Sequence, residues 1–161
     1  MGGDHAPVEI VKGAIAALKE DSELHITLFG RSDQVDLSHV PDSVQDRLDF
    51  EHAEDVVEMC ESPAISFKKK PKSSIRLGLE AVKEGRIQSF VSAGNTGAVM
   101  STSTLVLKRI RGIERPAIGT LLPSTQGHVL VLDVGSNMDA KPKHLQQFAL
   151  MGHFFSQLIL G

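Results

Sequence analysis

The order of segments along this chain is the feature that most limits its fold. Short runs rich in apolar and β-branched residues alternate with segments whose apolar residues recur at helical spacing. The strand-like runs are 24–29, 47–53, 87–92, 117–122 and 128–134, and the helix-like segments are 7–20, 74–85, 98–110 and 142–160. Such alternation is typical of an α/β domain with a mostly parallel sheet and helices on both faces. We therefore expect a single α/β domain over residues 1–161, with buried strands at 117–122 and 128–134.

Composition excludes several classes of protein. The chain is 161 residues long and 41% hydrophobic, which is enough to bury a core. A net charge of -3 and only 4% aromatic residues argue against nucleic-acid binding, because base stacking needs aromatic side chains among cations. The single cysteine, Cys60, excludes an internal disulfide and favours a reducing compartment. Neither a membrane span nor a secretory signal is evident, so we expect a cytoplasmic protein.

Three turns carry glycine or small residues where a helix is expected to begin. They are "GGDHAP" (2–7), "SAGNTG" (92–97) and "DVGSNMDAKP" (133–142). Backbone amides at a helix start, together with the helix dipole, form a phosphate site, and small residues let an anion come close. The candidate residues are Gly3, Asp4 and His5 in the first turn, Ser92, Gly94, Asn95, Thr96 and Gly97 in the second, and Asp133, Gly135 and Asn137 in the third. Two alternatives stay open: the glycines serve only the backbone angle, and Asn95 or Thr96 caps a helix.

Two clusters of cations are the other candidates. "KKKPKSSIR" (68–76) contains Lys69 and Lys70, and a second cluster ends at Arg115. Either a phosphate-bearing substrate or an acidic protein partner would suit these cations, and a solvated loop is the simpler alternative. Arg109 and Arg111 are candidates for docking an acidic partner. Asp133 and Asp139 lack the spacing of a closed metal site, so neither a metal nor a cofactor is expected.

Four stretches of the chain strongly resemble the PlsX family, the acyl-ACP:phosphate acyltransferases of bacterial phospholipid synthesis. They are "MGGDHAP", "SAGNTGA", "RPAIGTLLP" and "LDVGSNMDAKPKHLQQFALMG", with "KKKPKSSI" as a looser match. The resemblance implies a three-layer α/β/α fold similar to isocitrate and isopropylmalate dehydrogenases, and a homodimer. Family members are about twice this length, so we expect the N-terminal part of a longer protein, without its first strand and second half.

The resemblance also implies a reaction and its partners. Long-chain acyl-ACP and inorganic phosphate would give acyl phosphate and free ACP, and the acyl phosphate would pass to a membrane-bound glycerol-3-phosphate acyltransferase. Peripheral association with the inner face of the membrane is implied as well. In this scheme His5, Asn95 and Lys69 are the candidate catalytic residues, and the other turn residues, with Lys70 and Arg115, are candidates for binding substrate.

Two other functions fit the same turns. One is a related phosphotransacetylase or dehydrogenase that binds coenzyme A or a nucleotide, although no turn has the G-x-G-x-x-G spacing of a dinucleotide site. The other is a non-catalytic module that holds an anion or ACP. Formation of acyl phosphate from acyl-ACP and phosphate would separate an enzyme from such a module.

Overall fold

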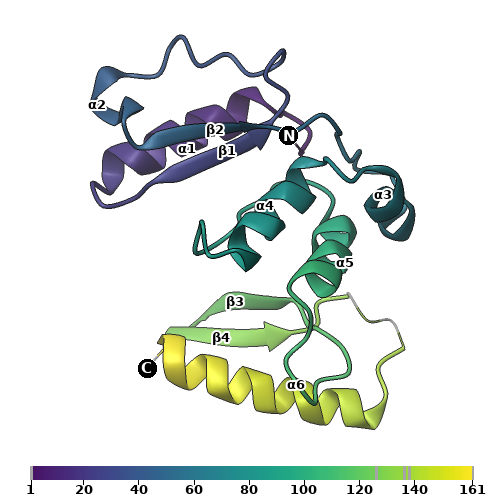
Figure 1. The fold of residues 1–161 in the computed structure, drawn as a ribbon. Helices are drawn as coiled ribbons and strands as arrows, with labels where there is room; N and C mark the ends of the chain where they lie inside the picture. Colours follow the sequence, from purple (N-terminus) through teal and green to yellow (C-terminus); the bar gives the residue numbers. More distant parts are fainter. Residues whose placement is uncertain (1, 126, 136, 138, 161) are drawn as a thin grey trace. The chain divides into compact units, whose positions relative to one another are not determined.

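The computed structural model describes residues 2–125, 127–135, 137 and 139–160. The chain divides into two compact units, residues 1–108 and residues 109–161. The first unit contains five helices and a parallel pair of strands, and the second contains a β-hairpin and one long helix (Figure 1). A mixed α/β composition, as the sequence predicts, is confirmed.

The first unit begins with a helix packed on a parallel strand pair. Helix α1 (Val8–Glu20) is followed by β1 (Ile26–Gly30), the short helix α2 (Asp42–Gln45) and β2 (Leu48–His52). The two strands pair in parallel from Ile26 opposite Leu48 to Gly30 opposite His52. The side chain of Arg47 closes the end of α1, because its guanidinium donates to the carbonyls of Leu18, Asp21 and Leu24. The sequence therefore predicts these two strands and α1 to within two residues at either end.

Three helices complete this unit and supply its core. They are α3 (Pro63–Lys69), α4 (Ser74–Lys83) and α5 (Thr96–Val106), and both α3 and α4 pack against α5. The core cluster consists of Val57, Ile75, Leu79, Ala98 and Val106, with Phe67, Phe90 and Val99 packed against it. The sequence predicts α4 and α5, although α5 ends at Val106 and not near residue 110, and it does not predict α3, whose last residues fall in the lysine-rich segment 68–76.

The second unit is an antiparallel hairpin with a helix beside it. Strand β3 (Gly119–Ser124) pairs with β4 (Gly127–Leu132), from Gly119 opposite Leu132 to Ser124 opposite Gly127. Helix α6 (Pro142–Phe155) contacts β4 and continues as a π-helical turn, Ser156–Leu160. Gly152 lies where α6 meets β4, since a Cβ there would be 2.8 Å from a methyl carbon of Leu132.

Three expectations for the strands and their packing are wrong in this structure. Residues 87–92 form no strand in the described part of the chain, and Val91 is 92% exposed. The hairpin strands are not buried, because Leu121, Leu122 and Val129 are all more than 40% exposed. Helical spacing in the segment 142–160 also predicts one core-facing stripe that includes Leu145 and Phe148, but this stripe is only partly buried, with Phe148 covered and Leu145 exposed. An apolar run shows that a segment can pair or pack, but the partner has to come from elsewhere in the chain.

Candidate functional site

The first two glycine-rich turns lie against each other in the first unit. A Cβ on Gly2 would be 3.1 Å from the Cα of Gly94, and one on Gly3 would be 3.0 Å from the carbonyl oxygen of Ala93. Gly2 and Gly3 also have positive φ angles of 142° and 98°, which side chains rarely tolerate. The small residues therefore allow two backbones to touch. This geometry places Gly2 and Gly3 against the turn of residues 92–97, and Asp4 and His5 follow them in the chain.

The second turn leads into α5 and presents amides at its N-terminus. Asn95 is the N-cap residue, and its Oδ1 accepts a hydrogen bond from the amide of Ala98 at 2.9 Å. Among the described residues, the amides of Thr96 and Gly97 have no hydrogen-bond acceptor, and the Thr96 side chain is exposed. Gly94 donates its amide to Ser92 Oγ at 3.1 Å. The first turn of α5 thus offers two free amides and one hydroxyl to an anion.

Gly97 has a packing role as well as a free amide. A Cβ at this position would be 2.9 Å from Cγ of Pro63, the first residue of α3. Because such a contact is closer than real Cβ atoms show, any side chain here would push α3 and α5 apart. The alternative in which the glycines serve the backbone and its packing therefore holds for Gly97, without excluding a ligand at its amide.

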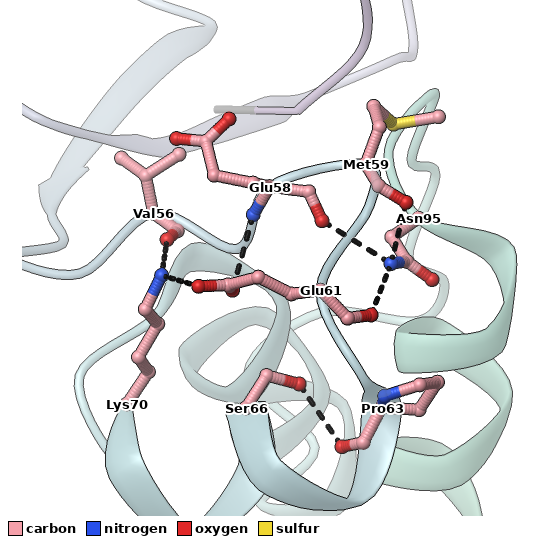
Figure 2. A network of polar contacts seen from close by, with 8 residues as sticks. All are labelled: Val56, Glu58, Met59, Glu61, Pro63, Ser66, Lys70 and Asn95. Carbon is pink, nitrogen blue, oxygen red and sulfur yellow. Dashed lines mark hydrogen bonds and ion pairs between the residues drawn. The ribbon is translucent and has the colours of Figure 1, made fainter.

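Asn95 and Lys70 both bind one short segment, residues 56–61, which we call the strap. Asn95 Nδ2 donates to the carbonyls of Glu58, Met59 and Glu61 (Figure 2). Lys70 Nζ contacts the carbonyl of Val56 and the carboxylate of Glu61, each at 2.5 Å. The hydrogen bond from the Lys70 ammonium holds the pKa of Glu61 below its usual value of 4.5. The ammonium of Lys70 is therefore already paired, and the amide of Asn95 lies inside the fold.

His5, Asp4 and Lys69 have exposed side chains. His5 and Asp4 precede α1, and His5 lines an open hollow of about 540 Å³ together with Ala6, Val8 and Glu9. Lys69 is the last residue of α3, and it has no ion-pair partner within the part of the chain that the structure describes. Among the described residues, neither His5 nor Lys69 makes a side-chain hydrogen bond or ion pair.

The third turn belongs to the second unit and is held together by its own side chains. The Oδ1 atom of Asp133 accepts from the backbone amide of Asn137 at 3.1 Å and from its Nδ2 at 2.9 Å. Asn137 Nδ2 also donates to the carbonyl of Pro116. Gly135 has a positive φ of 91°. Arg115, which precedes Pro116 in the sequence, is half-buried. Ser136 and Met138 of this turn lie outside the described residues.

A network beside α6 fixes the segment 109–115. Arg109 donates to the carbonyl of Glu114, and Gln147 joins the amide of Glu114 to the carbonyl of Gly112. Buried His144 lies 3.2 Å from the Glu114 carboxylate, which Lys143 also contacts. The hydrogen bond from Lys143 is the main cause of a lowered pKa of Glu114. Arg109 is therefore anchored, whereas Arg111 is exposed with no partner recorded in the described chain.

Sequence reasoning did not find the strap or the role of Glu61. The acidic residues from 33 to 61 are a visible feature, but no spacing in them indicates that three carbonyls converge on an asparagine more than 30 positions later. In the described ranges, no three His, Cys, Asp or Glu side chains gather as metal ligands would. No helix of the described chain has the length and apolar character needed to cross a membrane.

Comparison with known proteins gives matches over the entire chain. A family model described as "Fatty acid synthesis protein" matches residues 1–161. A protein named phosphate acyltransferase from Heliobacterium modesticaldum is 50% identical over 163 residues, covering 100% of this chain and 48% of that protein. Proteins with the same name from Desulfitobacterium hafniense and Magnetococcus marinus are 47% and 44% identical, covering 100% of this chain and 48% and 46% of their own lengths.

Identity of this size over the whole chain is decisive for family membership. The chain spans about half the length of the curated relatives it matches. The matched region includes all three glycine-rich turns and both clusters of cations. The resemblance indicated by the sequence motifs is thereby confirmed, and the chain belongs to the PlsX family of fatty acid synthesis proteins.

Proposed function

We propose that the full-length protein carrying this sequence is a phosphate acyltransferase, which moves a long-chain acyl group from acyl-ACP to inorganic phosphate for phospholipid synthesis. The observation that carries this proposal is the match of the entire chain to curated proteins with that name, at up to 50% identity. Two features of the first unit also support it. The first two glycine-rich turns lie in contact, and the free amides at the start of α5 suit a phosphate.

In the proposed reaction an oxygen of hydrogen phosphate attacks the thioester carbonyl carbon. The new C–O bond forms as the C–S bond breaks, the thiolate takes the proton of the phosphate, and the products are acyl phosphate and ACP thiol. No covalent enzyme intermediate is needed, because holding phosphate next to the thioester removes most of the entropic cost of their meeting. The amides of Thr96 and Gly97 would hold the phosphate, with the Thr96 hydroxyl as a further donor.

His5 and Lys69 keep their proposed catalytic roles. The free ammonium of Lys69 would neutralise charge on the phosphate, and His5, on the adjoining turn, would carry the proton from phosphate to thiolate. Lys70 is a weaker candidate because Glu61 already pairs with it. Gly3 and Asp4 would shape the phosphate turn, together with Ser92 and Gly94.

Other parts of the proposal concern residues and features beyond this turn. Arg115, Asp133, Gly135 and Asn137 remain candidates for contacting substrate, and amides of residues 2–5 would be donors to the oxyanion. We propose Arg111 rather than Arg109 for docking the acidic ACP, because Arg109 is tied to Glu114. The three-layer α/β/α fold, the homodimer, the hand-off to a membrane glycerol-3-phosphate acyltransferase and peripheral membrane association also remain proposals.

Replacing Lys69 tests the proposal in the full-length protein. With acyl-ACP and phosphate as substrates, the wild type should release ACP and form acyl phosphate only when phosphate is present. Lys69→Met should lower kcat/KM for phosphate by about 10- to 100-fold, because a charge-assisted contact to the phosphate is lost. The measurement is the phosphate dependence of initial rates.

Lys19→Met is the matched control, since Lys19 is an exposed lysine at the end of α1. Its kinetics should equal those of the wild type. Binding of acyl-ACP without formation of acyl phosphate would contradict the proposal and favour a binding module. Equal kinetics in Lys69→Met and Lys19→Met would remove Lys69 from the site.

A further inference from the structure

The side chain of Asn95 is fully occupied by contacts within the protein. Its Oδ1 accepts from the amide of Ala98, while Nδ2 lies 3.2 Å from the carbonyl oxygen of Glu58 and 3.0 Å from those of Met59 and Glu61. The residue is only 8% exposed. An amide nitrogen has two hydrogens, so three carbonyls around it share them. Neither hydrogen of Nδ2 is therefore left free to donate to a substrate.

Only an amide side chain can make both kinds of contact at this position. The oxygen caps α5 and the nitrogen holds the strap, so one residue joins the start of the helix to a segment more than 30 positions earlier (Figure 2). An aspartate would keep the cap but place an oxygen against three carbonyl oxygens. A serine would keep a cap acceptor and lose the contacts with the strap.

Contacts from other elements hold the strap in place as well. Lys70, at the end of α3, binds the Val56 carbonyl and the Glu61 carboxylate, and the amide of Glu58 donates to the second carboxylate oxygen of Glu61 at 3.2 Å. The strap is therefore held by Asn95 on one side and by Lys70 on the other (Figure 2). Because the Glu61 carbonyl binds Asn95 and its carboxylate binds Lys70, Glu61 links the two.

We infer that Asn95 is a positioning residue, which sets the orientation of the Thr96 and Gly97 amides by fixing the start of α5 to the strap. This inference rests on the proposed function, in which those amides bind phosphate. Asn95 would then act on the phosphate through the backbone of α5 and would not contact the reacting atoms. A small displacement of a binding group can cost on the order of 100-fold in rate, so the strap would matter to catalysis without touching the substrate.

Three variants of the full-length protein test the inference. Asn95→Ser and Asn95→Asp keep an acceptor for Ala98 and lose the donors to the strap, whereas Glu61→Gln keeps the carbonyl that Asn95 binds and weakens the contact with Lys70. Gln45→Glu makes the same change from amide to carboxylate as Asn95→Asp, at an exposed position on α2, and is the matched control. The measurements are steady-state kinetics with each substrate varied, and hydrogen exchange of the strap amides.

Both Asn95 variants should raise KM for phosphate by on the order of 10- to 100-fold and leave KM for acyl-ACP unchanged, with faster exchange of the strap amides. Glu61→Gln should also raise KM for phosphate and speed the exchange of the strap amides, but by smaller factors. This result would separate positioning from direct contact, because Glu61 does not belong to the proposed phosphate site. Gln45→Glu should match the wild type in every measurement.

The inference is overturned if KM for phosphate stays at the wild-type value in both Asn95 variants, whether or not the strap exchanges faster. A KM change in the Asn95 variants with none in Glu61→Gln would also overturn it and restore direct contact. If the wild type shows no phosphate-dependent activity, the proposed function fails separately. Chemical shifts of the Thr96 and Gly97 amides during titration with inorganic phosphate then decide the inference, which requires weaker binding in Asn95→Ser.

Discussion

Glycines in this chain differ in what surrounds them, although the sequence alone makes them look alike. Gly13 lies on the exposed side of α1, with nothing within 4 Å of the place where a Cβ would be. Gly78 is buried in α4, and a Cβ there would be 2.3 Å from a ring carbon of Phe90. The first glycine only weakens its helix, whereas the second makes room for an aromatic ring.

Alanine at these two helical glycines should therefore have opposite effects on stability. Gly13→Ala should raise the free energy of unfolding by about 0.5–1 kcal/mol, because it removes the conformational entropy cost of glycine in a helix. Gly78→Ala should lower it by about 1–3 kcal/mol, because Phe90 must move from its place beside the core cluster. Urea denaturation of both variants, monitored by circular dichroism, checks the pair. Equal effects of the same sign would contradict the packing described for Gly78.

At the scale of elements, the strap is joined to α3 through the carboxylate of Glu61, which titrates in acid. The Lys70 hydrogen bond lowers the pKa of Glu61 in the folded state, with the Glu58 amide adding to it and desolvation opposing it. A carboxylate with a lowered pKa stabilises the fold above its unfolded pKa, and this contribution is lost as the pH falls through the folded pKa. The stabilising contribution of Glu61 is therefore lost over a pH range that begins near 4.5 and extends downward.

Glu61→Gln should make the fold less stable at neutral pH and less sensitive to acid. The difference between this variant and the wild type should shrink as the pH falls from about 6 to about 3, because protonated glutamate and glutamine are both neutral. Denaturant midpoints measured across this range give the difference. Glu20→Gln makes the same change at an exposed position on α1, where the side chain has no hydrogen bond or ion pair among the described residues, and is the matched control. A constant difference for Glu61→Gln would show that the contact with Lys70 adds nothing to the fold.

Helices and strands were predictable from the sequence where the residues of the segment itself indicate its structure. Helical spacing from Val8 to Leu18 predicts α1, and the closing Gly85 predicts the end of α4 to within two residues. Asn95 is predictable as a helix cap because the preference is local. Its contacts with the strap are not predictable, since they depend on where a distant acidic segment folds. The predictions of a strand over residues 87–92 and of buried hairpin strands are wrong for the same reason. Strand pairing and burial depend on which other segments fold beside them.

At the scale of the whole molecule, family membership and local geometry both support the proposed binding of phosphate. The entire chain matches curated phosphate acyltransferases and spans about half of their length. Within the first unit, two of the three glycine-rich turns lie in contact, and the first turn of α5 has free amides beside them. The third turn, in the second unit, is held by its own Asp133 and Asn137. The proposed function therefore requires phosphate to bind at the start of α5.

A crystal structure of the full-length protein with inorganic phosphate bound is the most direct test of that claim. We expect phosphate oxygens about 3 Å from the amide nitrogens of Thr96 and Gly97, with the Lys69 ammonium nearby and Asn95 still holding the strap. Phosphate bound at another place, with those two amides turned away from it, would contradict the account.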